Sequence, residues 1–290
     1  MSVLILSARP ETASNRRLEQ AAEAAGVQLA VVDATTLVAN ASGALHVGDR
    51  EPFSPPPAVV LARVGNWRPA SLLALLEAAT AAGAATPNPA AAVRTGRDHW
   101  RTAQVLAAAD IPVPTTLAGA DPEALAGVAA SRLRFPVVVK QRRSRMGVGV
   151  IRCAGQDHLE AVLDSLWRLG DEVVVQEYVD SGGVSFRCFV VDGTTVAAAR
   201  FTATGDEWRS NAARGGRAEA LVPDAALAEL AEAAARAAGL GVCGVDLLPG
   251  RHGVVVGELN PTPGFVALER ATGVDVAAAV IDHLARMIHE

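Results

Sequence analysis

Residues 244–264 read GVDLLPGRHGVVVGELNPTPG, in which two apolar runs flank a short turn. This pattern predicts an antiparallel β-hairpin. Glu258 and Asn260 are two positions apart on the second run, so a strand places both side chains on one face. The expected hairpin therefore presents at least two oxygen-bearing side chains to the same side.

The register of the hairpin decides where Asp246 points. Opposed residues have numbers with a constant sum, which is 502 or 504 for a turn centred on Arg251 or His252. Both sums are even, so Asp246 is expected beside Glu258 and Asn260, whereas an odd register would place it behind the sheet. Carboxylate and amide oxygens suit Mg²⁺, which leaves its other positions to water and phosphate. The alternative is that these three residues form only the polar side of a half-exposed hairpin.

Composition limits the class of protein. Half of the 290 residues are apolar, but no run approaches the roughly 18 uninterrupted apolar residues of a membrane span. The opening MSVLILSARPE has no basic segment before its apolar run, which predicts a buried strand rather than a secretory signal. Cys153, Cys188 and Cys243 form no Cys-X-X-Cys pair and indicate buried thiols in a reducing cytoplasm. The net charge of -5 disfavours a general nucleic-acid binder.

The first part of the chain predicts a small Rossmann-like α/β unit. Residues 3–6 and 28–32 are strand-like, and residues 16–25 between them have helical composition and end at Gly26. The first loop lacks the glycines of a dinucleotide fingerprint. A further strand at 58–62 and a helix at 71–82 follow, and this unit is expected to end near residues 87–89.

The next part predicts a phosphate-binding segment. A helix is expected over residues 94–109, beginning in TGRDHW and ended by the PVP segment at 112–114. Residues 136–140 then form a strand that delivers Lys140 to a basic loop with Gly147 and Gly149. A lysine beside backbone N–H groups of a glycine-bearing loop can hold polyphosphate. A solvated basic turn is the alternative.

A second hairpin is predicted around Asp192 and Gly193, after the apolar strand 172–179. Pairing Val191 with Thr194 places Arg187 and Arg200 on one face. Two guanidinium groups this close favour an anion between them, although exposed neighbours are an alternative. The same pairing places an apolar set on the other face: Phe186, Cys188, Val190, Ala197, Ala199 and Phe201.

The segment at 204–219, TGDEWRSNAARGGRAE, is too polar and glycine-rich for a strand, and predicts a mobile loop that handles anions. Helices are expected over residues 225–238 and 274–288.

The chain resembles the ATP-grasp superfamily of carboxylate-amine ligases, and within it the RimK-type glutamate ligases. The resemblance is carried by seven motifs taken in order: VVVK, VVQEYV, FRCFVVDG, WRSNAARGG, GVDLL, GELNPTPGF and ALERATGVDVA. LysX-like ligases are near relatives, to which ARGGRAE is also similar. The resemblance implies an α/β fold of three domains, 1–89, 90–171 and 172–290. It also implies that ATP lies between the sheets of the second and third.

The resemblance further implies roles for individual residues. Lys140 would contact the nucleotide phosphates, and Asp246, Glu258 and Asn260 would hold Mg²⁺ or Mn²⁺. Arg187 and Arg200 would steady an acyl phosphate or a substrate carboxylate. Near the adenine and over the reacting phosphate, the implied nucleotide-binding residues are Gln176, Glu177, Tyr178, Val179, Ser185, Arg209, Ser210 and Asn211.

Two positions depart from the family pattern. His99 stands where the family usually has lysine, and it would be a weaker, pH-dependent phosphate contact. Ser185 stands where an aspartate is usual. Arg142, Arg143 or Arg145 could compensate for the missing lysine.

The expected function is an ATP-dependent ligase that joins an amino-acid amine, such as that of glutamate, to a carboxylate of a peptide, protein tail or small molecule, or that acts in peptide natural-product synthesis. The alternatives are a ligase that loads a carrier protein and a nucleotide-binding regulator with little turnover. We expect a cytoplasmic homo-oligomer, a dimer or tetramer, without nucleic-acid or membrane partners.

Overall fold

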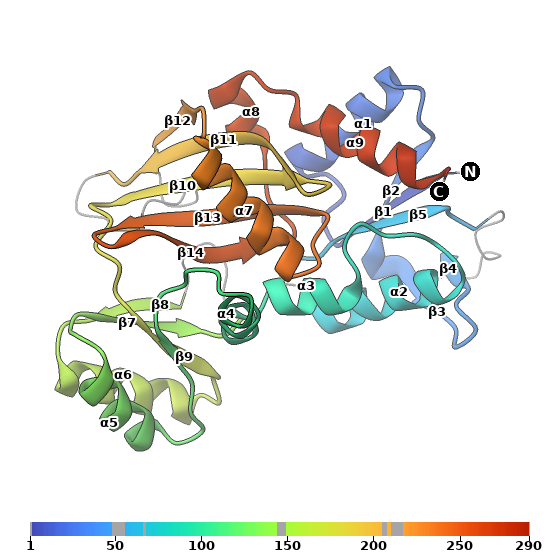
Figure 1. The fold of residues 1–290 in the computed structure, drawn as a ribbon. Helices are drawn as coiled ribbons and strands as arrows, with labels where there is room; N and C mark the ends of the chain where they lie inside the picture. Colours follow the sequence, from blue (N-terminus) through green and yellow to red (C-terminus); the bar gives the residue numbers. More distant parts are fainter. Residues whose placement is uncertain are drawn as a thin grey trace.

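The computed structural model describes residues 2–47, 56–65, 68–143, 149–204, 208–209 and 217–289. The first unit contains a parallel sheet in the order β2-β1-β5, made of β1 (Val3–Ser7), β2 (Leu29–Asp33) and β5 (Val59–Arg63) (Figure 1). Helix α1 (Ala13–Ala24) connects β1 to β2, and α2 (Pro69–Ala81) packs against β5. Every residue of β1 is buried, as a strand covered on both faces requires. The predicted strand, helix and strand are thus confirmed.

Between β2 and β5 the chain forms a short turn and ribbon that the sequence pattern did not indicate. The 3-10 turn η1 (Ala34–Thr36) leads into β3 (Leu37–Ala39), which pairs with β4 (Leu45–Val47). Buried Leu37 and Leu45 attach this ribbon to the core beneath α2. The ribbon therefore extends the first unit without adding to its main sheet.

The predicted helix over residues 94–109 is wrong as a single element. The chain instead forms α3 (Ala90–Gly96) and α4 (His99–Ala108), with a break at Arg97 and Asp98. The Asp98 carboxylate accepts hydrogen bonds from the backbone N–H groups of Trp100 and Arg101, at 3.0 and 3.2 Å. Aspartate is a strong N-cap because it satisfies N–H groups that lack a partner within the helix, so a new helix begins here.

The middle unit has its own sheet, ordered β6-β9-β7-β8. It consists of β6 (Thr116–Leu117), β7 (Val137–Gln141), β8 (Val150–Cys153) and β9 (Val173–Glu177), with α5 (Pro122–Arg132) and α6 (Gln156–Arg168) lying together along it (Figure 1). Because β9 pairs with β7 over its whole length, the expected domain boundary between residues 171 and 172 is misplaced. The middle unit extends through Glu177.

The C-terminal sheet has the order β12-β11-β10-β13-β14. Its strands are β10 (Val184–Val191), β11 (Thr194–Thr202), β12 (Arg217–Leu221), β13 (Val242–Gly250) and β14 (Gly253–Asn260). Helix α7 (Ala225–Ala237) covers one face, and α8 (Val266–Thr272) and α9 (Val276–Met287) lie toward the first unit (Figure 1). Positive φ angles of 52° at Asp192 and 71° at Gly193 form the predicted two-residue turn.

The first and last units share one hydrophobic core. Val3, Ile5 and Leu18 pack in the same buried cluster as Phe189 and Phe265. The rings of Phe189 and Phe265 meet edge to face with their centroids 5.7 Å apart. Packing therefore joins residues at opposite ends of the chain, so the expected boundary near residue 89 does not separate independent cores.

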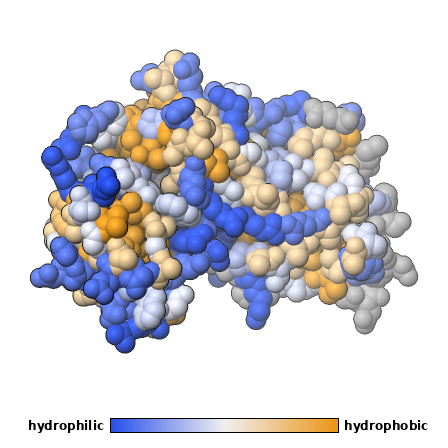
Figure 2. Space-filling view, turned by 60° about the horizontal axis from the view of Figure 1, so that its bottom comes forward, coloured by the Kyte–Doolittle hydropathy of each residue, from blue (hydrophilic) through white to orange (hydrophobic). Residues whose placement is uncertain are grey.

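The surface carries no broad apolar belt on the side shown in Figure 2, where hydrophobic residues occur in small groups among hydrophilic ones. Within the described residues, no helix is both long and apolar enough to cross a membrane.

Replacing Phe265 tests the shared core. Phe265 is fully buried, so Phe265→Ala leaves a cavity and is expected to lower the free energy of unfolding by about 3–5 kcal/mol. Urea unfolding followed by circular dichroism measures the change. Val222→Ala is the control, because Val222 is 93% exposed and its truncation should have little effect. A loss as small for Phe265→Ala as for the control would contradict the shared core.

Candidate active site

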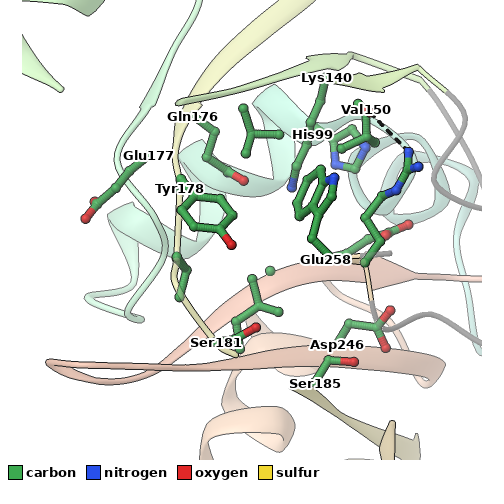
Figure 3. Close-up of a pocket in the computed structure, with 16 residues that line it drawn as sticks. His99, Lys140, Val150, Gln176, Glu177, Tyr178, Ser181, Ser185, Asp246 and Glu258 are labelled. Atoms are coloured by element: carbon green, nitrogen blue, oxygen red, sulfur yellow. Dashed lines mark hydrogen bonds between the residues drawn. The ribbon is translucent and has the colours of Figure 1, made fainter. Parts of the chain in front are cut away.

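A pocket lies between the middle and C-terminal sheets (Figure 3). His99 reaches it from the first turn of α4, Lys140 from β7, and Asp246 and Glu258 from the β13–β14 hairpin. Its lining brings together most of the sequence-predicted site with several further residues: His99, Val138, Lys140, Val150, Gln176, Glu177, Tyr178, Val179, Ser181, Ser185, Trp208, Arg209, Asp246, Leu248, Gly257 and Glu258.

A β-bulge determines the face on which Asp246 lies. At the turn Gly250 opposes Gly253, so opposed residue numbers add up to 503, an odd register. A bulge next to Asp246 changes the sum to 504, and Asp246 then opposes Glu258 directly. The prediction that the two carboxylates share a face is confirmed. The register at the turn alone would have placed Asp246 behind the sheet.

Arg187 lies against the Asp246 carboxylate. Its Nε and Nη2 atoms donate to the two carboxylate oxygens of Asp246, each at 2.6 Å, and its guanidinium carbon lies 5.5 Å from the ring centroid of Phe201. Burial acts to lower the pKa of Arg187, but the charges of Asp246 and Glu258 raise it overall. A permanent cation thus sits beside the carboxylate pair, where it can also attract an anionic group.

Arg200 does not join this cluster, and its predicted position beside Arg187 is wrong. A bulge between Phe189 and Val190 shifts the β10–β11 register, so that Phe186 opposes Arg200 and Arg187 opposes Ala199. Arg200 is exposed on the opposite face of the sheet from Arg187. The shift likewise separates the predicted apolar set: Phe186, Cys188 and Val190 face α7, while Ala197, Ala199 and Phe201 face the first unit.

Asn260 opposes Gly244 two residues beyond Glu258. Its side-chain oxygen accepts a hydrogen bond from the Thr262 backbone N–H at 3.0 Å, and it lines a small cavity with Arg97, His99 and Glu258. The described part of the chain contains no group of three or more His, Cys, Asp and Glu residues able to hold a metal. Two carboxylates and one amide nevertheless fit Mg²⁺, which is usually held by one or two carboxylates together with phosphate oxygens.

Lys140 and His99 lie together at one end of the pocket. Burial lowers the pKa of Lys140, while the charges of Glu258 and Asp246 oppose that shift. Burial and the neighbouring Lys140 ammonium together lower the pKa of His99 to about 3. The imidazole is therefore neutral at physiological pH in the free protein. The pH-dependent contact of His99 with a bound phosphate stays a prediction.

The other end of the pocket is formed where β9 leaves the middle sheet. The Glu177 side chain points away from Lys140 and Asp246 (Figure 3) and accepts a hydrogen bond from the Thr115 backbone N–H at 3.3 Å. The peptide groups of Tyr178 and Val179 form no backbone-to-backbone hydrogen bond with any described residue. Both residues are half-buried, and peptide groups that water leaves need partners, so this segment offers donors and acceptors to the edge of a ligand.

Trp208, which the sequence reasoning did not name as a site residue, lines the pocket together with the predicted Arg209. Trp208 meets Tyr178 edge to face with ring centroids 5.8 Å apart, and the Arg152 guanidinium carbon lies 5.7 Å from the Trp208 ring. Arg209 donates to the Val150 carbonyl oxygen at 3.2 Å. The edge-to-face ring pair and the neighbouring guanidinium groups give this side of the pocket an aromatic wall.

The sequence matches a RimK-like ATP-grasp domain model over residues 96–284. The chain belongs to the RimK-like ATP-grasp family. Among curated relatives, a protein named probable alpha-L-glutamate ligase from Azotobacter vinelandii is 33% identical over 290 residues, which cover 98% of this chain and 95% of that protein. A relative of the same name from Methanococcoides burtonii is 33% identical over 293 residues, with coverage of 98% and 95%.

Solved structures agree with this family. A RimK domain ATP-grasp protein from Sphaerobacter thermophilus superimposes with a TM-score of 0.74 at 28% identity, covering 98% of this chain and 99% of that one. The ATP-grasp ligase PsnB, in a complex with a phosphomimetic precursor, Mg and ADP, superimposes with a TM-score of 0.72 at 24% identity, covering 99% and 98%, and supports the fold. ATP-grasp ligases of this kind form carbon–nitrogen bonds and use ATP and Mg²⁺.

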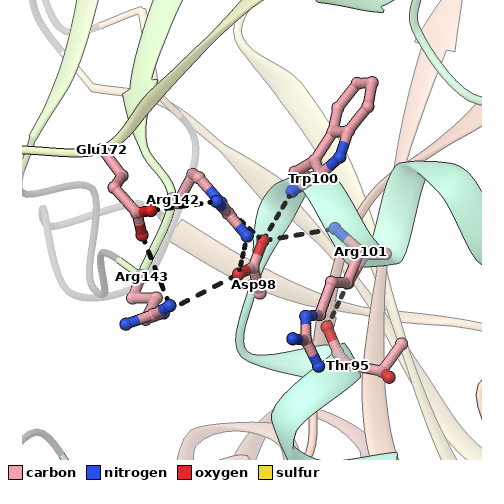
Figure 4. Close-up of polar contacts among 8 residues, drawn as sticks. Thr95, Asp98, Trp100, Arg101, Arg142, Arg143 and Glu172 are labelled. Atoms are coloured by element: carbon pink, nitrogen blue, oxygen red, sulfur yellow. Dashed lines mark hydrogen bonds and ion pairs between the residues drawn. The ribbon is translucent and has the colours of Figure 1, made fainter. Parts of the chain in front are cut away.

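In this RimK-like ATP-grasp chain, Arg142 and Arg143 do not line the pocket beside His99, and compensation by Arg145 stays a prediction. Arg142 and Arg143 instead form ion pairs with Asp98 and Glu172 (Figure 4). Ser185 is buried on the Arg187 face of β10 and lines the pocket without supplying a carboxylate. Ser210, Asn211, Arg145 and Gly147 lie outside the described residues.

The neutral state of His99 can be observed directly. We expect its imidazole NMR signals to show no titration between about pH 5 and 8, because burial and Lys140 lower its pKa to about 3. A His99→Gln variant identifies the signal. In the unfolded chain this residue binds a proton below its ordinary value of 6.5, so acidification from there toward pH 3 favours unfolding. A titration midpoint near 6.5 in the native protein would contradict the assignment.

Proposed function

We propose that this chain is an ATP- and Mg²⁺-dependent ligase that joins an amino acid to a carboxylate through an acyl phosphate. The observation that carries the proposal is the direct opposition of Asp246 and Glu258 at the end of a pocket that also contains Lys140. Hard oxygen donors and a buried ammonium are the groups that a triphosphate and its cation require.

The reaction consists of two displacements. A carboxylate oxygen of the acceptor attacks the γ-phosphorus of ATP, and ADP leaves. The amine then attacks the acyl carbon, phosphate leaves, and the nitrogen loses a proton as the amide forms. Bound Mg²⁺ would supply charge neutralisation at the phosphate oxygens. No side-chain nucleophile is needed, because phosphoryl transfer depends mainly on positioning and electrostatics.

The proposed residue roles follow the geometry of the pocket. Asp246, Glu258 and Asn260 would hold Mg²⁺ or Mn²⁺, and Lys140 would bind phosphate oxygens. The peptide groups of Tyr178 and Val179 would bind the adenine edge. Three other residues that line the pocket would contact the nucleotide less directly: Gln176, Ser185 and Arg209. Arg209, and Arg187 through its position against Asp246, would lie near the reacting groups. Ser210 and Asn211 remain predictions from the family resemblance.

L-Glutamate is the first amine to test, because the curated relatives are named as probable alpha-L-glutamate ligases. The acceptor would be a carboxylate on a peptide, a protein tail or a small molecule, and a carrier protein or a peptide natural-product precursor is an alternative. We further propose that the enzyme is cytoplasmic and homo-oligomeric. A second candidate function, nucleotide binding with little turnover, is favoured by the neutral His99 in place of lysine.

ADP release distinguishes the two functions. The purified chain is incubated with MgATP, with each amino acid in turn and with a panel of peptide and small-molecule carboxylates, and products are identified by mass spectrometry. ADP release that requires both an amine and a carboxylate supports the ligase. Nucleotide binding without such release across the panel supports the regulator. The His99→Lys variant tests whether histidine at this position weakens nucleotide binding. If its nucleotide affinity equals that of the wild type, histidine in place of lysine does not weaken binding.

Removing either carboxylate should abolish Mg²⁺-dependent turnover. We expect Asp246→Asn and Glu258→Gln each to reduce kcat/KM by about a hundredfold or more, because each removes a charged cation ligand. Coupled-enzyme detection of ADP measures the loss. The matched controls are Asp282→Asn and Glu229→Gln, which make the same changes at exposed helix positions. Equal activity of site and control variants would overturn the metal assignment.

A further inference from the structure

The pocket lies between two bodies with separate cores. The core of the middle unit includes Val137, Val139 and Leu159. Leu106 of α4 and Ile111, which follows α4, instead pack with the C-terminal sheet and α7. Helix α4 therefore belongs to the C-terminal body, although it precedes the middle unit in the sequence. His99 and Lys140 consequently reach the pocket from different bodies.

Both chain connections between the bodies lie at one end of the pocket. The chain enters the middle sheet before β6 and leaves it after β9, and these two segments lie side by side, since the Glu177 N–H donates to the Thr115 carbonyl oxygen at 2.8 Å. This is the end formed by Tyr178 and Val179. The covalent connection therefore constrains the base end of the pocket and leaves the phosphate end to be held by non-covalent contacts.

The Asp98–Arg142 pair crosses between the bodies at the phosphate end (Figure 4). Arg142 Nη2 lies 2.6 Å from Asp98 Oδ2, and Arg142 Nε lies 3.2 Å from Asp98 Oδ1. The Asp98 side chain is only 3% exposed and that of Arg142 20%. The adjacent backbone adds a third bond, from the His99 N–H to the Arg142 carbonyl oxygen at 2.9 Å.

Neither member of the pair lines the nucleotide pocket, but both lie beside residues that do. Asp98 immediately precedes His99, and Arg142 follows Lys140 by two positions. Arg142 lines a separate cavity beside Trp100 and Trp167. Arg143 adds a weaker contact, with its Nε 3.7 Å from Asp98 Oδ2. The pair is thus placed to fix pocket residues without touching the ligand.

We propose that the Asp98–Arg142 pair is a latch that holds the phosphate end of the pocket together and sets the position of His99 relative to Lys140. Both are positioning residues. This inference rests on the proposed nucleotide site and adds a determinant of affinity for the phosphate part of the nucleotide. The base end, joined by the chain itself, does not depend on the latch.

Two substitutions break the latch while preserving its surroundings. Asp98→Asn keeps an N-cap of equal quality for α4 and removes only the charge. Arg142→Met keeps an unbranched stem and removes the guanidinium. Asp164→Asn is the matched control: it breaks the Arg168–Asp164 pair on α6, whose side chains are 70% and 53% exposed.

Binding of MgADP and of adenosine separates the two ends of the pocket. By calorimetry, we expect the Kd of MgADP to rise roughly tenfold in Asp98→Asn and in Arg142→Met, the size expected for a lost charged hydrogen bond. Competition binding should show the Kd of adenosine changed by less than about twofold, because adenosine lacks the phosphates. Arg142→Lys should recover part of the affinity for MgADP. The double variant should bind MgADP no more weakly than the weaker single variant.

Two results would overturn the latch: unchanged affinity for MgADP in both single variants, or an equal loss of affinity for adenosine, which would indicate general destabilisation. The thermal midpoint of each variant, compared with that of Asp164→Asn, identifies such destabilisation. A wild-type chain that binds no MgADP would instead refute the proposed function, so the two failures are distinguishable.

Discussion

The strict alternation of side chains along a β-strand is the constraint on which this site depends. A charged residue on a strand faces either the pocket or the opposite side, and a shift of one residue in pairing exchanges the two. Two bulges make that choice here. One brings Asp246 opposite Glu258, and the other separates Arg200 from Arg187. The C-terminal sheet thus presents two carboxylates to the pocket and holds one guanidinium against Asp246, an arrangement that neither hairpin turn would produce alone.

Burial determines the protonation states of these side chains and their need for counter-charges. Arg187 and Asp246 are both largely removed from water, and each supplies the counter-charge that the other needs. The charges of Glu258 and Asp246 partly offset the effect of burial on the pKa of Lys140, whereas burial and Lys140 keep His99 neutral. The pocket therefore contains opposed charges at fixed positions before any ligand enters. Such preorganised groups stabilise developing phosphate charge at little reorganisation cost.

Much of the fold was predictable from local patterns, because those patterns carry their own physical cause. The apolar run of β1, Gly26 after α1 and the Asp192–Gly193 turn each determine their local conformation. The bulges were not predictable, since an extra residue in one strand leaves no compositional mark. The break at Asp98 had a signal, a capping residue after Gly96, but it was outweighed by the helical composition on both sides. The family resemblance placed Lys140 and Glu258 correctly in one pocket, yet it could not show that Arg142 turns away toward Asp98.

The shared core of the first and last units affects how the chain is made. During synthesis the β2-β1-β5 sheet leaves the ribosome long before Phe265 and α9, which cover one side of it. At typical rates of about 5–20 residues per second, the nascent sheet exposes that apolar side for on the order of ten seconds or more. The N-terminal unit therefore completes its core only after Phe265 and α9 have been translated.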